Sequence, residues 1–230
     1  MKIVCIGAHP DDVELGMAGT VAKHTSKGDD VHIVICTLGI GGDCGDAMVR
    51  ESEAREAARI LGTKLQILDY PVTRLNRPSR EFELIIKRVI EDLSPTRVYT
   101  HSPFDYHQVH ESTCECVVKA ARDVPQLLHY EEASSTSPDF KPNAYTDITD
   151  HIDSKLKCIE VHATQGNKLY MQSTTTTALA RARYVLSKIG TRPNGMAEAF
   201  SISRLIVQRT DSQIKESNKE ANLTSSSIAA

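Results

Sequence analysis

The sequence contains no tryptophan and few other aromatic residues, with 4 Phe and 7 Tyr in 230 residues. Aromatic platforms on which nucleic-acid bases could stack are therefore poorly supplied. A surplus of positive charge is also missing, because 27 Lys and Arg residues stand against 30 Asp and Glu and give a formal net charge of −3. Since nucleic-acid binding depends largely on a basic surface, we expect no nucleic-acid partner.

Long hydrophobic runs are absent as well. No apolar stretch approaches the roughly 18 residues that a membrane-spanning helix needs, so we expect no membrane span. The chain opens with strand-like residues instead of the basic segment, apolar core and cleavage site of a secretory leader. Six cysteines are too few for a disulfide framework in a chain of this length. We therefore expect a cytoplasmic enzyme or binding protein.

The first half of the chain alternates apolar runs with segments of helical periodicity. Residues 2–8 form a continuous apolar run, which is typical of a strand buried on both faces. Strands are predicted at residues 2–8, 31–38, 65–70 and 97–100, and helices at residues 13–27, 49–61, 80–93 and 109–124. This order predicts an α/β fold, in which helices cover both faces of a mainly parallel sheet.

The second half is less regular. Further strands are predicted at residues 126–132, 144–148 and 197–207, and further helices at residues 151–163 and 176–188. We expect residues 1–207 to form a single domain. Residues 208–230 are polar and lack a periodic apolar face, and we predict that they form a disordered C-terminal tail.

Residues that suit metal binding or acid–base chemistry follow two of the predicted strands. The segment 9–14 comes directly after the first strand, and His101, Asp105, His107 and His110 follow the fourth. Ligands of open parallel sheets bind outside the carboxyl ends of the strands. We therefore expect these side chains to gather at one edge of the sheet.

The spacing of these residues suggests a catalytic metal site. His9 and Asp12 lie three residues apart on a turn that opens a helix, so an imidazole and a carboxylate can reach one ion. Catalytic zinc needs three nitrogen or oxygen ligands and an open position for water, and His110 can supply the third ligand. Asp11 would be free to act as a general base. His107 could donate a hydrogen bond or a proton to a developing oxyanion or leaving group.

Each half of this constellation also has a plain structural interpretation. The turn at residues 9–12 has the proline and acidic residues of an ordinary helix start. The histidines at residues 101–110 could belong to a solvated loop. Their convergence at one edge of the sheet favours the metal site.

Two motifs resemble those of a known family. The segment AHPDDVELG at residues 8–16 resembles the AHPDDxE signature of the LmbE-like/PIG-L family of zinc-dependent N-deacetylases. The second family signature has the form P-x-D-x-H-x-D-H, and residues 103–110 have the sequence PFDYHQVH. The segment RESEA at residues 50–54 is similar to the family's R-x-x-E-A, and later blocks extend the similarity to about residue 207.

The resemblance implies a Rossmann-like fold and one zinc ion per chain, held by His9, Asp12 and His110. It implies that Asp11 is the general base, and that His107 stabilises the tetrahedral oxyanion or acts as an acid. We take both as hypotheses for this chain.

The resemblance implies a role for Arg50, and the sequence departs from the family pattern at Val109. The arginine that matches Arg50 contacts substrate in the family. The family has a carboxylate where this chain has Val109, and a carboxylate there would raise the pKa of the neighbouring histidine. Here either Asp105 or Glu111 gives His107 that support, or His107 is less basic than its counterpart in the family.

The implied function is removal of an N-acetyl group from a small-molecule amino-sugar conjugate of the N-acetylglucosamine type. A homo-oligomer is compatible with the sequence. The alternative from another class is a non-catalytic, Rossmann-like nucleotide- or sugar-binding protein. The glycine-rich segment 39–45 superficially suggests phosphate binding, but it follows the second strand and lacks the G-x-G-x-x-G spacing.

Overall fold

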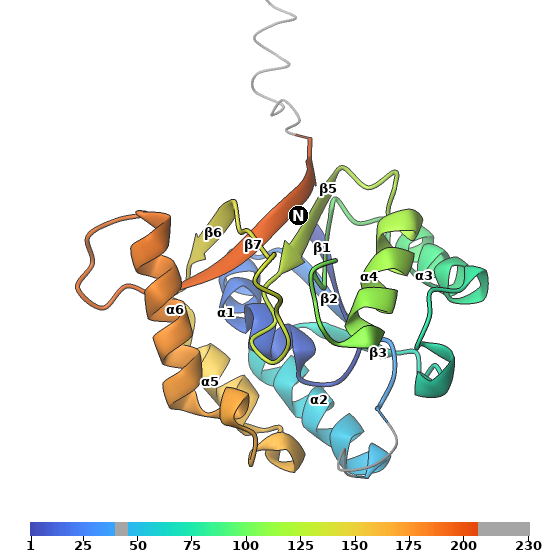
Figure 1. Ribbon diagram of the computed structural model, residues 1–230, viewed down its shortest axis with the longest axis horizontal. Helices are drawn as coiled ribbons and strands as arrows, with labels where there is room; N and C mark the ends of the chain where they lie inside the picture. Colours follow the sequence, from blue (N-terminus) through green and yellow to red (C-terminus); the bar gives the residue numbers. More distant parts are fainter. Residues whose placement is uncertain (40–45, 207–230) are drawn as a thin grey trace, which may run out of the picture.

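A seven-stranded sheet forms the centre of the computed structural model, which describes residues 1–39 and 46–206 (Figure 1). The strands lie in the order β3-β2-β1-β4-β5-β7-β6. Their bounds are β1 Lys2–Gly7, β2 Asp30–Ile35, β3 Lys64–Ile67, β4 Arg97–Thr100, β5 Gln126–Tyr130, β6 Ala144–Asp147 and β7 Ala197–Leu205. Neighbours among β1 to β5 pair in parallel, whereas β7 pairs antiparallel with β5 and β6. The predicted α/β fold with a mainly parallel sheet is confirmed.

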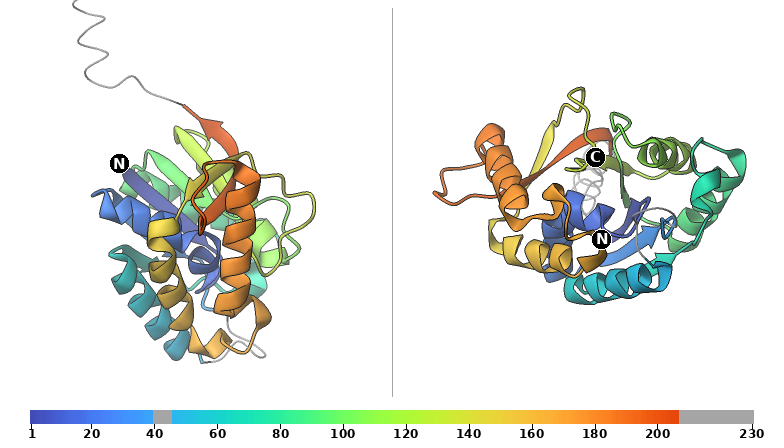
Figure 2. Two further views of the ribbon diagram at one scale, coloured as in Figure 1. Left: turned by 90° about the vertical axis from the view of Figure 1, so that its left-hand side faces the viewer. Right: turned by 60° about the horizontal axis from the view of Figure 1, so that its bottom comes forward.

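Helices cover both faces of this sheet (Figures 1 and 2). One face packs against α3 (Arg80–Leu93) and α4 (Gln108–Ala120), and the other against α1 (Asp12–Ser26), α2 (Ala47–Leu61) and α5 (Ile152–Glu160). Alternate residues of β1 enter the two cores: Val4 and Ile6 pack on the α3 and α4 side, and Ile3 and Cys5 on the other. This period of two explains why the strand reads as a continuous apolar run. The last helix, α6 (Ser173–Ser187), packs on β7.

The order of the strands brings the two sequence motifs together. From β1 the chain proceeds to β2 and then β3 on one side, whereas β4 and β5 lie on the other side of β1. The direction of strand order therefore reverses between β1 and β4, which are direct neighbours. The loops that follow these two strands leave the same edge of the sheet, at the bottom of Figure 1. Such a switch point is where open α/β sheets place their ligands.

The predicted elements all form, with ends that differ by a few residues. The helix predicted at residues 13–27 is interrupted, because Met17 has φ and ψ angles of −153° and 20° within α1. Most of the glycine-rich segment and the predicted C-terminal tail lie outside the described residues, so the single domain and its disordered tail stay predictions. Within residues 1–39 and 46–206, no helix is both long and apolar enough to cross a membrane.

Candidate active site

The first motif forms a tight turn between β1 and α1. The His9 backbone N–H donates to Asp12 Oδ2 at 2.7 Å, which fixes the carboxylate against the start of the turn. Asp11 directly precedes α1 and has a left-handed backbone with φ of 95°, a strained conformation for a residue with a side chain. Such strain is stored where the surrounding structure imposes it, often at functional sites.

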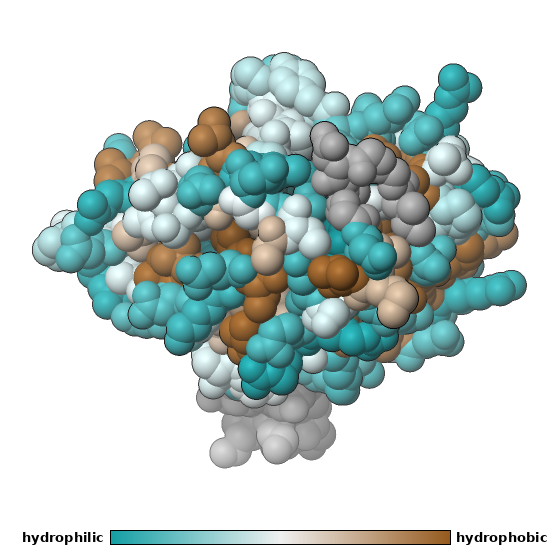
Figure 3. Space-filling model, turned by 90° about the horizontal axis from the view of Figure 1, so that it is seen from below, coloured by the Kyte–Doolittle hydropathy of each residue, from teal (hydrophilic) through white to brown (hydrophobic). Residues whose placement is uncertain are grey.

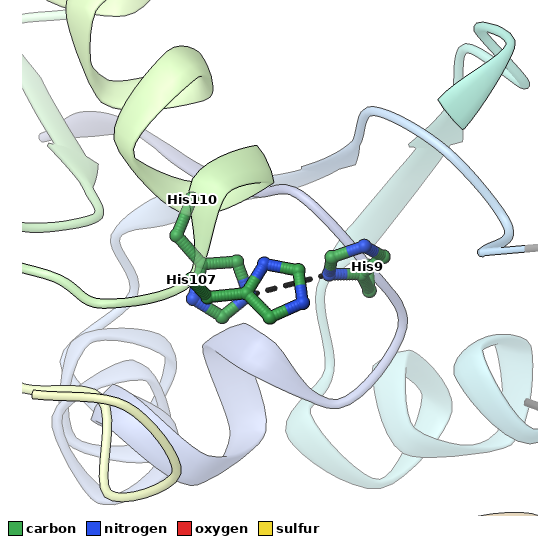
Figure 4. Close-up of side chains that lie close together, drawn as sticks. All are labelled: His9, His107 and His110. Atoms are coloured by element: carbon green, nitrogen blue, oxygen red, sulfur yellow. Dashed lines mark hydrogen bonds between the residues drawn. The ribbon is translucent and has the colours of Figure 1, made fainter. Parts of the chain in front are cut away.

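The three predicted metal ligands meet at this turn. His9 Nδ1 lies 3.3 Å from His110 Nε2 (Figure 4) and 3.5 Å from Asp12 Oδ2, and His110 Nε2 lies 3.3 Å from Asp12 Oδ1. Ligand atoms of tetrahedral zinc at bond lengths of about 2.0–2.2 Å lie roughly 3.3–3.6 Å apart. Each of the three distances falls in or at the edge of this range, with His9 and His110 each facing a different oxygen of Asp12.

A carboxylate from the second motif orients His110. Asp105 Oδ2 lies 3.2 Å from His110 Nδ1, and the Ser135 hydroxyl oxygen is also 3.2 Å from that nitrogen. Because Nδ1 is engaged there, Nε2 points to Asp12, an arrangement typical of metal-bound histidines. Burial disfavours the imidazolium, yet Asp12 and Asp105 hold the pKa of His110 well above its usual range. These carboxylates create a site that attracts positive charge.

Asp12 is the acidic centre of the cluster. Burial would raise its pKa, but the imidazoles of His110, His101 and His9 hold the pKa of Asp12 well below its usual range. His101 is also part of a trio with Asp12 and His110 whose possible ligand atoms lie within 4.8 Å of one another. However, His101 Nε2 accepts the backbone N–H of Ala8 at 2.9 Å. Because its lone pair is used there, His101 is a weaker candidate ligand than His9.

Asp11 and Arg50 lie beside the trio. Burial and the charge of Asp12 raise the pKa of Asp11 to about 7, while Arg50 opposes that rise. Arg50 Nη2 lies 3.5 Å from Asp11 Oδ1 and donates to the carbonyl oxygen of Pro10 at 2.8 Å. Its Nη1 donates to the carbonyl oxygen of Leu38 at 3.0 Å. Arg50 therefore ties the turn that bears Asp11 to the end of the β2 segment.

His107 forms the outer wall of the cluster. Its ring stacks on His110 with 4.2 Å between centroids and lies edge-on to His9 at 5.1 Å (Figure 4). A trio of His9, His107 and His110 also has possible ligand atoms within 4.8 Å of one another. Partial burial and the nearby rings of His110 and His9 lower the pKa of His107 to about 4. The imidazole of His107 is consequently neutral at pH 7.

The departure at Val109 has a structural explanation. Val109 is buried in the hydrophobic core on the α3 and α4 side of the sheet. Asp105 accepts the His107 backbone N–H at 2.8 Å, but its other oxygen pairs with His110 rather than with the His107 ring. Among the described residues, no carboxylate hydrogen-bonds to the His107 ring. Burial and the rings of His110 and His9 lower the pKa of His107, and the charges of Asp12 and Asp105 oppose this effect without overcoming it.

All six predicted site residues line one cavity of about 90 Å³. They are His9, Asp11, Asp12, Arg50, His107 and His110. The cavity lies on the side of the molecule toward the carboxyl ends of the parallel strands, which is the side that Figure 3 views from below. An open, polar cavity beside a metal-binding trio suits hydrolysis of a small molecule.

Comparison with known proteins places this site in a family. Residues 4–121 match the family described as PIG-L: GlcNAc-PI de-N-acetylase. The chain is also 36% identical over 167 residues to a protein of Escherichia coli (strain K12) named uncharacterized deacetylase YaiS. The aligned region covers 70% of this chain and 89% of that protein. The chain belongs to the PIG-L family. It is therefore a member of a family of deacetylases.

Two solved structures show how far the likeness reaches. The N,N'-diacetylchitobiose deacetylase from Pyrococcus horikoshii is 27% identical, with a TM-score of 0.74 over 87% of this chain and 83% of that one. The 4-carboxy-2-hydroxymuconate hydratase from Pseudomonas putida KT2440 has the same TM-score of 0.74, over 91% of this chain and 98% of that one, at 20% identity. The second likeness shows the fold alone. Because a deacetylase and a hydratase share this fold, the reaction must be argued from the site residues.

Four residues that line the cavity outside the PIG-L motifs were missed by sequence reasoning. They are Ser134, Gln165, Lys168 and Tyr170. Most of these residues come from irregular segments after residue 121, beyond the PIG-L match. No periodicity marks such segments, and the only signal was the similarity of residues 162–165 to a later family block.

Proposed function

We propose that this PIG-L protein is a zinc-dependent hydrolase that removes the N-acetyl group from an amino-sugar conjugate of the N-acetylglucosamine type. The observation that carries this proposal is the close approach of three donor groups. His9 Nδ1 lies 3.3 Å from His110 Nε2, and the two oxygens of the Asp12 carboxylate lie 3.5 Å from His9 Nδ1 and 3.3 Å from His110 Nε2. The donor set of two imidazoles and one carboxylate is common in catalytic zinc sites. The relationship to a diacetylchitobiose deacetylase supports the choice of substrate.

His9, Asp12 and His110 would hold zinc, which would polarise the amide carbonyl and lower the pKa of the attacking water. Asp11 takes the proton from that water and then delivers it to the nitrogen of the leaving amine. Its pKa of about 7 suits both steps, because the carboxyl group can accept and release a proton near neutrality. The bond between the carbonyl carbon and nitrogen breaks, and acetate and the free amine leave.

His107 and Arg50 would assist from the same cavity. His107 is neutral at pH 7, so we assign it a hydrogen bond from its ring N–H to the oxyanion rather than the donation of a proton. We assign Arg50 a contact with the substrate, in addition to its bonds to the carbonyls of Pro10 and Leu38. Those bonds also keep Asp11 facing the cavity.

The decisive experiment measures acetate release from a panel of N-acetylglucosaminides, including N,N'-diacetylchitobiose, by protein loaded with zinc. Elemental analysis of the same samples gives the metal content. We expect about one zinc per chain, and we expect His110→Ala to lose the metal and acetate release together.

The matched control is Lys119→Gln on the exposed side of the same helix, where Lys119 pairs with Glu115 and with no other acidic residue in the described ranges. It should behave as the parent protein does. Absence of acetate release from every member of the panel would overturn the proposed reaction and favour a binding protein. Full zinc occupancy in His110→Ala would overturn the ligand set.

A further inference from the structure

A second cavity lies at the opposite end of α1 from the catalytic turn. Its volume is about 380 Å³, against about 90 Å³ for the active-site cavity. Its walls come from the last turns of α1, the start of β4 and strand β6. Of the site residues, His9, Asp11 and Asp12 precede or begin α1, whose 15 residues span roughly 22 Å at 1.5 Å per residue. The second cavity is therefore separate from the active site.

Three cationic side chains line this cavity without a carboxylate partner. Lys23 and Lys27 come from the end of α1, and Arg97 from the start of β4. In the described part of the chain, none of the three forms an ion pair. Lys23 donates to the carbonyl oxygen of Asp147 at 2.8 Å. Arg97 donates to the side-chain oxygen of Gln126 at 2.7 Å and to the Tyr99 hydroxyl at 3.0 Å, whereas the side chain of Lys27 has no hydrogen bond among the described residues.

The nearby acids are engaged elsewhere. Asp147 lines the cavity, but its Oδ1 accepts the backbone N–H and the hydroxyl of Thr149 at 2.9 and 2.6 Å. Asp29 lies 2.7 Å from His24 Nδ1. Burial lowers the pKa of His24, and the charges of Arg97 and Lys27 lower it further, against the opposing effect of Asp29. Among the residues that line the cavity, three cationic side chains therefore stand against the single carboxylate of Asp147, which leaves an excess of positive charge.

A buried hydroxyl adds a second, independent observation. Thr20 lines the cavity and is only 1% exposed, and its Oγ1 has no hydrogen-bond partner among the described residues. Its backbone N–H, by contrast, donates to Glu198. Buried polar atoms are rarely left unpaired, so this hydroxyl indicates a missing partner.

The helix macrodipole explains only part of this arrangement. Lysines at the carboxyl end of a helix complement its partial negative charge, and this effect explains the positions of Lys23 and Lys27. The macrodipole explains neither Arg97, which belongs to a strand, nor the unpaired hydroxyl of Thr20. A ligand with several acceptor oxygens and negative charge would satisfy all of these groups at once.

We propose that this cavity binds a phosphorylated small molecule, with Lys27, Arg97 and the Thr20 hydroxyl donating to its phosphate oxygens. Phosphate presents several charged acceptors, which suit the planar fork of arginine and the point charge of lysine. The volume also falls in the range of small-molecule sites, roughly 300–1,000 Å³.

Isothermal titration of the full chain with inorganic pyrophosphate at physiological ionic strength tests this proposal. The titration is repeated on His110→Ala, because pyrophosphate would also bind a metal at the active site. We expect binding in both proteins. Lys27→Gln and Arg97→Gln should each weaken it by roughly tenfold, since each removes a charge-assisted contact. Thr20→Val should weaken it by a smaller factor.

Lys119→Gln is the control, because it removes one exposed positive charge from α4 without touching the cavity. Lys27 is exposed and Thr20→Val conserves shape, so both variants should fold even if Arg97→Gln does not. Affinity that is equal in Lys119→Gln, Lys27→Gln and Thr20→Val would overturn the site. So would binding that disappears in His110→Ala, because it would place pyrophosphate at the metal centre. Neither outcome bears on acetate release.

Discussion

Asp105 links the two histidines of the second motif. Its Oδ1 accepts the backbone N–H of His107 at 2.8 Å, and its Oδ2 lies 3.2 Å from His110 Nδ1. One side chain therefore fixes both the start of α4 and the ring orientation of the candidate metal ligand. This arrangement does not require a carboxylate at Val109, which packs in the core instead.

Replacing Asp105 should weaken metal binding without removing a ligand. Asp105→Asn keeps the shape but removes the charge that favours His110 with Nδ1 as the donor. We expect zinc affinity to fall by about 10- to 100-fold, which is typical for loss of a carboxylate behind a metal-bound histidine. Competition with a chromogenic chelator measures it. Glu111→Gln, at an exposed neighbouring position, is the control, and equal affinities in the two variants would contradict the assignment.

Asp11 allows binding to be separated from chemistry. Asp11→Asn keeps the size of the side chain and its contact with Arg50 but removes the base. We predict that zinc content stays unchanged while kcat falls by roughly 10²-fold or more. Steady-state acetate release and elemental analysis of the same preparation check both parts. Near-normal kcat in this variant would remove Asp11 from the mechanism.

At the scale of elements, α1 is held by distant residues where its own hydrogen bonds fail. Around the break at Met17, the backbone N–H groups of Gly19 and Thr20 donate to Glu198 at 3.0 and 2.7 Å. Lys155 donates to the carbonyl oxygen of Leu15 and to Glu198. The backbone N–H and C=O groups that the break leaves without helical partners therefore bond to a buried ion pair from α5 and β7.

The break in α1 shows where sequence reasoning fails. The apolar periodicity of residues 13–27 predicts one continuous helix and places it well. Its interruption depends on Lys155 and Glu198, which lie more than a hundred residues away in the chain. The close packing of α1 on β5 likewise depends on Gly16, because a Cβ there would lie 2.4 Å from the Tyr130 ring. Such contacts are properties of the folded chain and leave no local pattern.

We predict that breaking this buried pair destabilises the whole protein. Glu198→Gln leaves the Lys155 ammonium buried without its counter-charge, which typically costs about 3–5 kcal/mol. The double variant Lys155→Met with Glu198→Gln should recover part of that loss, because no charge then stays buried. Urea denaturation of the three proteins measures the difference. A double variant less stable than Glu198→Gln would show that the ion pair is not the source of the effect.

At the scale of the whole molecule, the sequence predicted the sheet better than the cavity. Strands that are buried on both faces appear in the sequence as apolar runs. Because the loops that follow parallel strands lie at one edge of the sheet, the meeting of His9 and His110 was predictable. The insertion of β7 between β5 and β6 was not, because strand pairing is non-local. The same holds for Lys168 and Tyr170, which reach the cavity from an irregular segment.

The proposed metal centre joins distant parts of the fold, so removing the metal should lower global stability. His9 and Asp12 follow β1 and His110 belongs to α4, and these groups come together only in the folded chain. A ligand that binds the folded state alone at a thousand times its dissociation constant contributes about 4 kcal/mol. For a domain of this size, 1 kcal/mol shifts Tm by about 2–4 °C, so stripping zinc with a chelator should lower Tm by about 8–16 °C. The Tm of His110→Ala should not respond to the same chelator. If elemental analysis shows that zinc has left the parent protein while its Tm is unchanged, the proposed trio does not bind the metal in the folded state.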